Sequence, residues 1–357
     1  MLVTASTVKD TLPNVQRFVG GNLAGGVDHM VVFLDAPEAD GQAEVREWLE
    51  KQPYVTAVHA GEQWWGGDRP DQLNVRQRIN VNLLKHVLAA GDWADWVFHI
   101  DGDEIVQVDR AVLDSVPAGI SAVRLAPLEA VSRKHWDGDP TWFKTLLDDD
   151  DLALIHALGV IDRPGNGAYF HGHVEGKSGI RPRSDGWLTL HKAVDVDREN
   201  LDAFRHEALR VLHYESYSGE DFVRKWTAMV ASGPTASFRP ARGNTAVALR
   251  ALIGKNLGEE KARAYLMKLF ERTTEDDFET LRDLGLLVEV DPRQGTHRPA
   301  DAPEGAVDAM RAALDEMRTQ PKRRFHPAQA RKEAREEARK EGRDDKVKAV
   351  RSLLRRS

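Results

Sequence analysis

The stretch from Trp96 to Glu104 combines an apolar run with a sudden cluster of acids, because Trp-Val-Phe-His-Ile is followed by Asp101-Gly102-Asp103-Glu104. A short apolar run bounded by turn residues predicts a buried strand of a parallel sheet. In open α/β sheets, ligands bind beyond the carboxyl ends of the strands. Carboxylates gathered there repel each other unless cations neutralise them, and their oxygens suit Mg²⁺ or Mn²⁺. The stretch therefore predicts either a metal–diphosphate site or a solvated turn, since Asp and Gly are common turn residues.

Upstream of this stretch, apolar runs and amphipathic segments alternate. The runs predict strands at residues 2–5, 29–34 and 55–59, and the four-residue spacing of apolar side chains predicts helices at 8–23, 44–50 and 72–90. This order predicts an α/β fold with a doubly wound, mostly parallel sheet. Downstream, the pattern predicts a strand at 122–128, short strands and turns at 168–187, and helices at 220–231, 244–287 and 307–317.

The composition excludes several classes of protein. The 357 residues include no cysteine, so the chain has neither disulfides nor a cysteine-based zinc site or nucleophile. No apolar run approaches the roughly 20 residues of a membrane span, and the N-terminus lacks the features of a signal peptide. We therefore expect a cytoplasmic protein.

Charge is distributed unevenly along the chain. Residues 321–357 contain 14 Lys or Arg and 6 Asp or Glu, a net charge of +8, whereas the whole chain carries −7, which leaves −15 on residues 1–320. Helix formers and i,i+4 charge pairs predict a basic helical tail. Such a tail suits peripheral contact with the inner face of an anionic membrane, docking on an acidic body, or a solvated helix. The acidic body would repel phosphate, so no specific nucleic acid is expected.

Five motifs occur in the order found in one enzyme family. They are Leu34-Asp35, a helix with Gln77, Arg78 and Asn82, the acids at 101–104, Gly176 to Pro182 followed by His191, and Leu212 to Ser218 followed by Phe222 and Lys225. The chain thereby resembles family 2-type glycosyltransferases with the GT-A fold, in particular a subgroup of small bacterial enzymes, over residues 1–230 or so. Two segments depart from the family pattern: residues 6–10 replace an Asn-Glu segment, and residues 36–40 replace a Gly/Ser-rich acidic turn.

The resemblance implies a domain organisation. Residues 1–235 would form a GT-A-like catalytic domain, with a nucleotide-binding half at 1–125 and an acceptor half at 126–235. A helical extension at 236–320 and the basic helical tail at 321–357 would follow.

The resemblance also implies a reaction. The enzyme would move a sugar from a nucleotide-sugar donor, expected to be a UDP-sugar, to a glycan or lipid-linked acceptor with inversion. A divalent Mn²⁺ or Mg²⁺ ion would neutralise the donor diphosphate. Asp103 is the expected direct ligand, and Asp101, on the same side of an extended chain, would contact the ribose or the metal through water. A late histidine, His191 or His213, would complete the metal sphere.

Further residues are expected to bind the donor. Asp35, at the end of an adjacent strand, would accept hydrogen bonds from the base or ribose, or alternatively serves as a turn or helix-capping acid. Gln77 and Arg78 occupy the polar side of an otherwise apolar helix and match the family motif. Lys177 and Arg181 are expected to neutralise phosphate.

An inverting transfer needs a general base, for which Glu175 and Glu215 are the two candidates. Glu175 belongs to the His-Gly-His-Val-Glu segment 171–175, which we interpret as the exposed face of an edge strand rather than as a metal site. Tryptophans in predicted loops provide either a sugar platform or packing: Trp64, Trp65, Trp136 and Trp142.

Two other functions compete with sugar transfer. A nucleotidyltransferase of related architecture would carry a Gly-rich N-terminal loop, and residues 4–13 contain no glycine. A non-catalytic protein that binds a nucleotide would use the acidic cluster without turnover.

Overall fold

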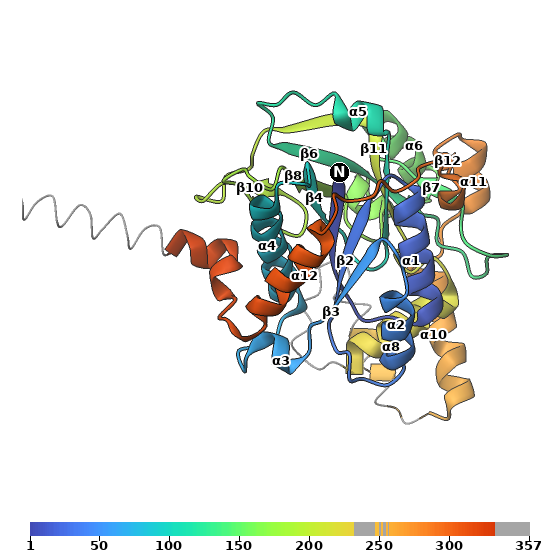
Figure 1. The fold of residues 1–357 in the computed structure, drawn as a ribbon. Coiled ribbons are helices and arrows are strands. Elements are labelled where there is room, and N and C mark those ends of the chain that lie inside the picture. The colour runs from blue at the N-terminus through green and yellow to red at the C-terminus, as the bar shows by residue number, and fades with distance from the viewer. Residues whose placement is uncertain (232–246, 250, 253–254, 256, 333–357) are drawn as a thin grey trace, which may run out of the picture.

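The computed structural model describes residues 1–231, 247–249, 251–252, 255 and 257–332. One mixed sheet runs through it, with helices on both faces (Figure 1). The strand order is β12-β7-β6-β8-β4-β1-β2-β3, and β11 pairs with both β5 and β6. The strands are β1 (Leu2–Val8), β2 (His29–Leu34), β3 (Val55–His59), β4 (Trp96–His99), β5 (Glu104–Val108), β6 (Ala122–Ala130), β7 (Trp142–Lys144), β8 (Lys177–Ile180), the hairpin β9 (Trp187–Leu188) and β10 (Ala193–Val194), β11 (Ala203–His213) and β12 (Leu287–Glu289). The helices are α1 (Leu12–Ala24), α2 (Gln42–Glu50), α3 (Glu62–Trp65), α4 (Leu73–Gly91), α5 (Arg110–Asp114), α6 (Asp149–Ala157), α7 (Asn166–Tyr169), α8 (Gly219–Ala231), α10 (Glu259–Thr273), α11 (Phe278–Asp283), α12 (Ala306–Glu316) and the 3-10 turns η1 (Pro292–Gln294), η2 (Met317–Thr319) and η3 (Arg323–Phe325).

Strands β3, β2, β1 and β4 run parallel, as the sequence predicts. In the register of β1, Val3 lies opposite His29 of β2, and Leu2 lies opposite Trp96 of β4. Every residue of β1 and β2 is buried. The predicted strands at 29–34 and 55–59 are confirmed residue for residue, whereas β1 extends beyond the predicted 2–5 to Val8.

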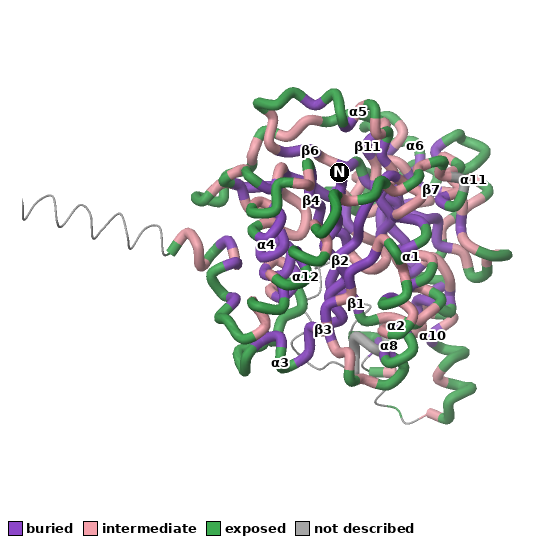
Figure 2. Tube along the Cα trace, viewed as in Figure 1, coloured by how far each residue is buried: buried purple, intermediate pink, exposed green. Residues whose placement is uncertain are grey.

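Alternate side chains of these strands enter two separate cores, as the two-residue repeat of a strand requires. On one face, Met30 and Val32 of β2 pack in the core that includes Phe18 of α1. On the other face, Val31 and Phe33 belong to the core formed with α4 and α12. Figure 2 shows the strands as a buried centre with exposed residues on the outer helices. The three layers confirm the α/β class and the doubly wound arrangement.

The other half of the sheet is mixed. β8 runs antiparallel to β4 and β6, and β7 runs antiparallel to β6. The long strand β11 lies parallel to β6 and antiparallel to β5. The sequence pattern does not predict β11, because residues 203–208 are exposed or half-buried and contain no apolar run. Pairing with two neighbours, rather than local hydrophobicity, holds this strand in the sheet.

The C-terminal segment folds back along the sheet. The predicted helix at 244–287 is interrupted at residues 274–277, between α10 and α11, and it ends before β12, which pairs antiparallel with β7. Met310 and Leu314 of α12 pack into the core beside α4. Part of the predicted helix and the tail from residue 333, including its amphipathic end, lie outside the described residues. Among the described helices, none has the length and apolar character needed to cross a bilayer.

Candidate active site

An open cleft of about 550 Å³ lies where three parallel strands end. Val8 closes β1, Asp35 follows β2 and Asp101 follows β4, and all three residues line the cleft. This is the position at which α/β sheets bind ligands. The acidic side chains of the lining outnumber the lysines and arginines: Asp10, Asp35, Asp101, Asp103 and Glu215 against Lys9, Arg224 and Lys225.

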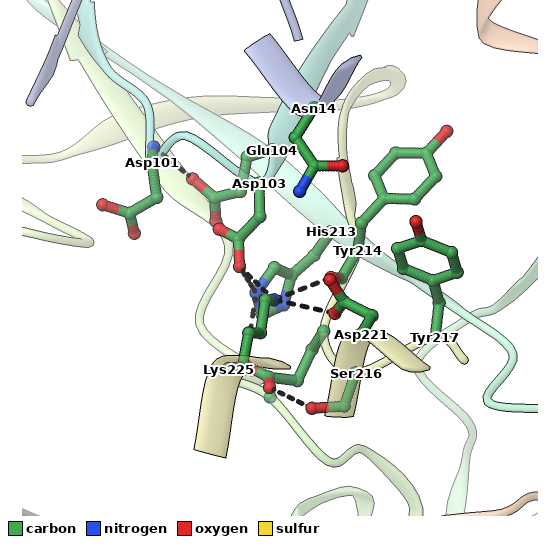
Figure 3. A network of polar contacts seen from close by, with 12 residues as sticks. Asn14, Asp101, Asp103, Glu104, His213, Tyr214, Ser216, Tyr217, Asp221 and Lys225 are labelled. Atoms are coloured by element: carbon green, nitrogen blue, oxygen red, sulfur yellow. Dashed lines mark hydrogen bonds and ion pairs between the residues drawn. The ribbon is translucent and has the colours of Figure 1, made fainter. Parts of the chain in front are cut away.

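The acid cluster forms a turn rather than the end of an extended strand. β4 ends at His99, and the backbone N–H of Glu104 donates to the carbonyl oxygen of Asp101 at 3.0 Å. The Glu104 carboxylate also accepts from the Asp101 N–H at 2.8 Å. Because the chain turns here, the side chains of Asp101 and Asp103 point apart (Figure 3), which corrects the expectation that both lie on one side of an extended chain.

Asp103 faces His213 and Glu215 on the floor of the cleft. His213, the last residue of β11, places its Nε2 3.9 Å from Asp103 Oδ2 and 3.8 Å from Glu215 Oε2. Lys225 of α8 donates to Asp103 Oδ2 at 2.7 Å (Figure 3). Burial alone would lower the pKa of Lys225, but the carboxylates of Asp103, Glu215 and Asp221 raise it. Lys225 is therefore a permanent cation beside Asp103.

Asp101 lies in a different set of contacts. Its Oδ1 accepts from Gln77 Nε2 at 2.6 Å, and its Oδ2 accepts from Lys177 Nζ at 2.5 Å. Burial opposes ionisation of Asp101, but the buried Lys177 ammonium lowers the pKa of this carboxyl. Asp101 is consequently an oriented carboxylate. The structure brings Gln77, Asp101 and Lys177 together, as three of the expected donor-binding residues.

Three histidines lie close together near the acid cluster: His173 and His213 are buried, and His191 is partly exposed. His173 places Nε2 2.7 Å from Glu104 Oε1, and its ring lies 4.3 Å from that of His191 and 4.7 Å from that of His213. His173 is 5% exposed, and residues 171–175 form no strand, since β8 begins at Lys177; the interpretation of 171–175 as the exposed face of an edge strand is therefore wrong. Burial, Lys177 and His173 lower the pKa of His191 to about 3, so this imidazole is neutral.

Asp35 and α4 form the opposite wall of the cleft. Arg76 donates two hydrogen bonds to the Asp35 carboxylate, from Nε to Oδ1 at 2.7 Å and from Nη2 to Oδ2 at 2.6 Å. Asn80 donates to Thr7 Oγ1 at 3.0 Å, and Asn82 donates to the carbonyl oxygen of Leu188 at 2.8 Å. The polar side of α4 is therefore a set of buried hydrogen bonds that positions the wall, and Asp35 does not cap a helix.

Four of the expected site residues do not line the cleft: Arg78, Glu175, Arg181 and Lys177, the last of which reaches Asp101 from below the surface. Arg181 donates to the backbone carbonyl oxygens of Ile120 and Val116, and it therefore supports a loop instead of neutralising phosphate. Glu175 lies 3.6 Å from Lys192 in a separate groove. Arg78 points away from the cleft, because successive residues of a helix face different directions.

The four tryptophans pack within the protein. Trp64 and Trp65 are buried, with exposed fractions of 1% and 3%, and each indole N–H is hydrogen-bonded. Trp136 and Trp142 are half-buried and contact the ring of Phe278 edge-on. The alternative of a sugar platform is therefore not supported at Trp64 or Trp65.

Several residues that line the cleft have no role predicted from the sequence, including Lys225, which the sequence offers only as part of a motif. Arg224 and Lys225 follow one another in α8, and Arg224 donates to Asp10 at 2.8 Å. Lys9 and Asp10 belong to the segment that departs from the family pattern, and both line the cleft. Only an electrostatic argument could have predicted these cations: a cluster of acids at strand ends is stabilised by nearby positive side chains, and α8 provides two of them.

The side-chain atoms of Asp103, His213 and Glu215 are of the kinds that bind a divalent cation. One imidazole nitrogen and two carboxylate oxygens lie within 4.8 Å of one another. Such a set suits Mn²⁺, which accepts both oxygen and imidazole ligands. Glu104, His173 and His213 form a second such group, but all three residues are buried, whereas Asp103 and Glu215 are partly exposed at the cleft. The first group is therefore the better candidate, and His191 and Asp101 lie outside it.

The solved structures that resemble this chain are distant from it in sequence, and three of them illustrate the likeness. No protein-family model and no curated protein matches the sequence. Staphylococcus aureus TarS, residues 1–349, is 9% identical over 80% of this chain and 73% of its own, with a TM-score of 0.33. The galactosyltransferase LgtC, in complex with donor and acceptor sugar analogs, is 14% identical over 51% of this chain and 58% of its own, with a TM-score of 0.23. The glycosyltransferase GlyE of Streptococcus pneumoniae TIGR4 is 10% identical over 88% of this chain and 62% of its own, with a TM-score of 0.21. These scores are too low to transfer a function.

Proposed function

We propose that this protein is a metal-dependent glycosyltransferase that transfers a sugar, with inversion, from a nucleotide-sugar donor such as a UDP-sugar to a glycan or lipid-linked acceptor. The observation that carries the proposal is the Asp103–His213–Glu215 group, which lies in an open cleft at the ends of parallel strands. Asp35 and Gln77, which belong to the motifs that resemble family 2-type glycosyltransferases, line the same cleft.

The nucleoside would bind between Asp35 and Asp101. Both carboxylates are held in place, Asp35 by Arg76 and Asp101 by Gln77 and Lys177. Oriented acceptors of this kind suit the N–H groups of a base and the hydroxyls of a ribose, since a carboxylate accepts hydrogen bonds only. Preorganisation of these acceptors lowers the cost of ordering the donor.

The diphosphate would lie beside Asp103. A divalent cation, when bound, would neutralise the diphosphate and stabilise it as a leaving group. Asp103 and His213 would hold that cation, and Glu215, the third member of the group, would serve as the base instead of as a ligand. Lys225 and Arg224 add positive charge to the same part of the cleft, where it can stabilise the departing diphosphate.

Glu215 would act as general base toward the acceptor hydroxyl. Of the two candidate glutamates, Glu215 lines the cleft, whereas Glu175 faces another groove. Ser216 donates to Glu215 Oε1 at 2.9 Å and so orients the carboxylate. A positioned carboxylate within reach of the acceptor provides the proton acceptor that inversion requires.

The test is a screen of nucleotide sugars for hydrolysis and transfer, in Mn²⁺ and in excess EDTA. The proposal expects release of nucleoside diphosphate from one class of donor in Mn²⁺ and loss of that activity in EDTA. Binding of nucleotide without turnover, with any donor and acceptor, would support a non-catalytic nucleotide-binding protein instead.

A further inference from the structure

A second groove lies where β6, β8 and β11 meet, and we refer to it as the arginine groove. It has two parts, of about 410 Å³ and 280 Å³, which share four lining residues: Arg124, Val174, Glu175 and Arg205. Residues 172, 173 and 191 line the cleft, whereas their neighbours 174, 175 and 192 line the arginine groove. Two short segments therefore separate the two sites, and a ligand of the groove does not occupy the cleft.

The register of the sheet places two arginines side by side in this groove. Arg124 of β6 lies directly opposite Arg205 of β11 in the parallel ladder, and Ser178 of β8 lies on the other side of Arg124. Paired residues of neighbouring strands project from the same face of a sheet. The proximity of the two guanidinium groups therefore follows from backbone pairing, and both side chains line both parts of the groove.

A break in the ladder leaves space beside the arginines. The pairing of β11 with β6 shifts between Arg205 and Arg210, so that residues 206–209 lie opposite a single residue of β6, Leu125. His206 and Glu207 belong to this interval, and both are exposed and line the groove. Irregular pairing of this kind changes the direction of side chains and is common next to binding sites.

The positive charge of the two arginines is only partly compensated. Arg124 is half-buried, and its Nη1 donates to the carbonyl oxygen of His191 at 2.7 Å. Arg205 is exposed, and its side chain forms no hydrogen bond or ion pair with any residue that the structure describes. Glu175 lines both parts of the groove, but it lies 3.6 Å from Lys192. Like charges on directly paired residues destabilise a sheet, so an anionic ligand would stabilise this arrangement.

The charge of the whole groove has the same sign. Three cations line its two parts, Arg124, Lys192 and Arg205, against the two acids Glu175 and Glu207. Burial and then Arg205 lower the pKa of Arg124, and Glu175 opposes them. The groove is therefore cationic at neutral pH, although the body of the chain is acidic.

The larger part of the groove also has an apolar wall. Leu146 is 45% exposed and lines it together with Val174 and Pro127. A lone exposed leucine is ordinary on a protein surface, but this one belongs to the same groove as the two arginines. Binding sites combine apolar walls with a few polar groups that fix the orientation of the ligand. The groove thus suits a ligand with an anionic end and an apolar end.

We propose that the arginine groove binds a phosphate monoester that carries an apolar chain, as lipid phosphates do. Guanidinium groups match phosphate oxygens through paired charge-assisted hydrogen bonds, and the two charges of a phosphate dianion balance those of Arg124 and Arg205. The chain would cover Leu146 and remove its apolar surface from water. Binding at this groove does not depend on sugar transfer, so the proposal stands or falls separately from the proposed function.

The test is calorimetric titration of the full chain with hexyl phosphate, and with inorganic phosphate and hexanol for comparison, at constant ionic strength and pH 8, where a phosphate monoester is a dianion. The variants are Arg124→Gln, Arg205→Gln and Leu146→Asn. The matched control is Arg272→Gln, an exposed arginine of α10, and Lys225→Gln reports phosphate that binds in the cleft. Arg205 is exposed, so its substitution decides the matter even where Arg124→Gln alters folding.

We expect the wild type to bind hexyl phosphate about tenfold more tightly than inorganic phosphate, since burial of a few methylene groups supplies that difference. Both arginine variants should bind hexyl phosphate about tenfold more weakly, whereas Arg272→Gln and Lys225→Gln should stay within about twofold of the wild type. Leu146→Asn should weaken binding of hexyl phosphate and leave that of inorganic phosphate unchanged. Wild-type affinity in Arg205→Gln, loss confined to Lys225→Gln, equal affinities for the two phosphates, or no binding of hexyl phosphate by the wild type would overturn the proposal.

Discussion

Two carboxylate–lysine pairs of similar geometry lie in opposite surroundings. Glu129 and Lys144 are 2.9 Å apart, and both side chains are fully buried. Asp103 and Lys225 are 2.7 Å apart, and their side chains are 26% and 17% exposed at the cleft. The first pair also has a second carboxylate, because Lys144 lies 3.1 Å from Asp276.

The two carboxylates differ in how far protein groups occupy their oxygens. Glu129 accepts from the backbone N–H groups of His171 and Gly172, so its lone pairs are occupied without any ligand. Asp103 instead has its Oδ2 3.9 Å from His213 Nε2, and its side chain is partly exposed to solvent. A buried ion pair enclosed by protein groups is costly to break, because the remaining charge is left uncompensated, whereas a solvent-facing pair leaves its carboxylate accessible to a ligand.

The largest expected effect is on stability. Lys144→Met leaves Glu129 and Asp276 as uncompensated buried carboxylates, so we expect it to lower the free energy of unfolding by about 3–5 kcal/mol. Lys225→Met leaves Asp103 with access to water, so we expect a loss of about 1–2 kcal/mol. Urea denaturation followed by circular dichroism measures both. Equal losses in the two variants would remove the distinction between the pairs.

The next effect is on activity. Asp103→Asn removes a charged ligand from the cleft while the fold is retained, and we expect transfer at saturating Mn²⁺ to fall by about 1,000-fold, equivalent to about 4 kcal/mol of transition-state stabilisation. Asp150→Asn, at an exposed position of α6, is the control and retains wild-type activity. Turnover near the wild-type rate in Asp103→Asn would contradict the assignment of the ligand.

Glu215→Gln distinguishes a general base from a metal ligand. We expect kcat at saturating Mn²⁺ to fall by about 100-fold, the usual contribution of a general base, while Mn²⁺ affinity changes little. Glu175→Gln, outside the cleft, should leave kcat and KM unchanged. A variant Glu215→Gln that recovers full activity at high Mn²⁺ would make Glu215 a ligand instead.

The smallest effect is the pH dependence of the buried cluster of Glu129, Lys144 and Asp276. Burial alone would raise the pKa of Asp276, but Lys144 and His171 lower it to about 2 from an ordinary value of 3.8. A carboxyl with a lowered pKa stabilises the fold above its unfolded value and loses that contribution as the pH falls toward the folded value. We expect about 1 kcal/mol of this contribution to be lost between pH 5 and pH 3. We expect the free energy of unfolding of Asp276→Asn, measured by urea denaturation, to fall by about 1 kcal/mol less over this pH range than that of the wild type. An equal fall in the two proteins would contradict the assignment.

Local pattern was sufficient for the parallel half of the fold. β2 and β3 are buried apolar runs, and the apolar positions of α4 repeat at helical spacing, so each element is specified within its own sequence. β11 depends on two neighbouring strands from elsewhere in the chain, and β12 depends on β7. These pairings have no local signature.

The same limit applies to the site. Asp35, Gln77, Asp103, His213 and Glu215 were predicted from motifs, and all of them line the cleft. The burial of His173 depends on its contact with Glu104, which is 69 positions away in the chain, so alternation within 171–175 could not reveal it. The helical motif placed Arg78 beside Gln77, but adjacent positions of a helix diverge in space.

The central claim is that Asp103 belongs to a metal-dependent donor site. Calorimetric titration with UDP, with GDP as control, in the presence and absence of Mn²⁺, on wild type and Asp103→Asn tests it most directly. We predict nucleotide binding by the wild type that requires Mn²⁺ and is lost in Asp103→Asn. Binding that is independent of Mn²⁺, or equal in the variant, would contradict the account.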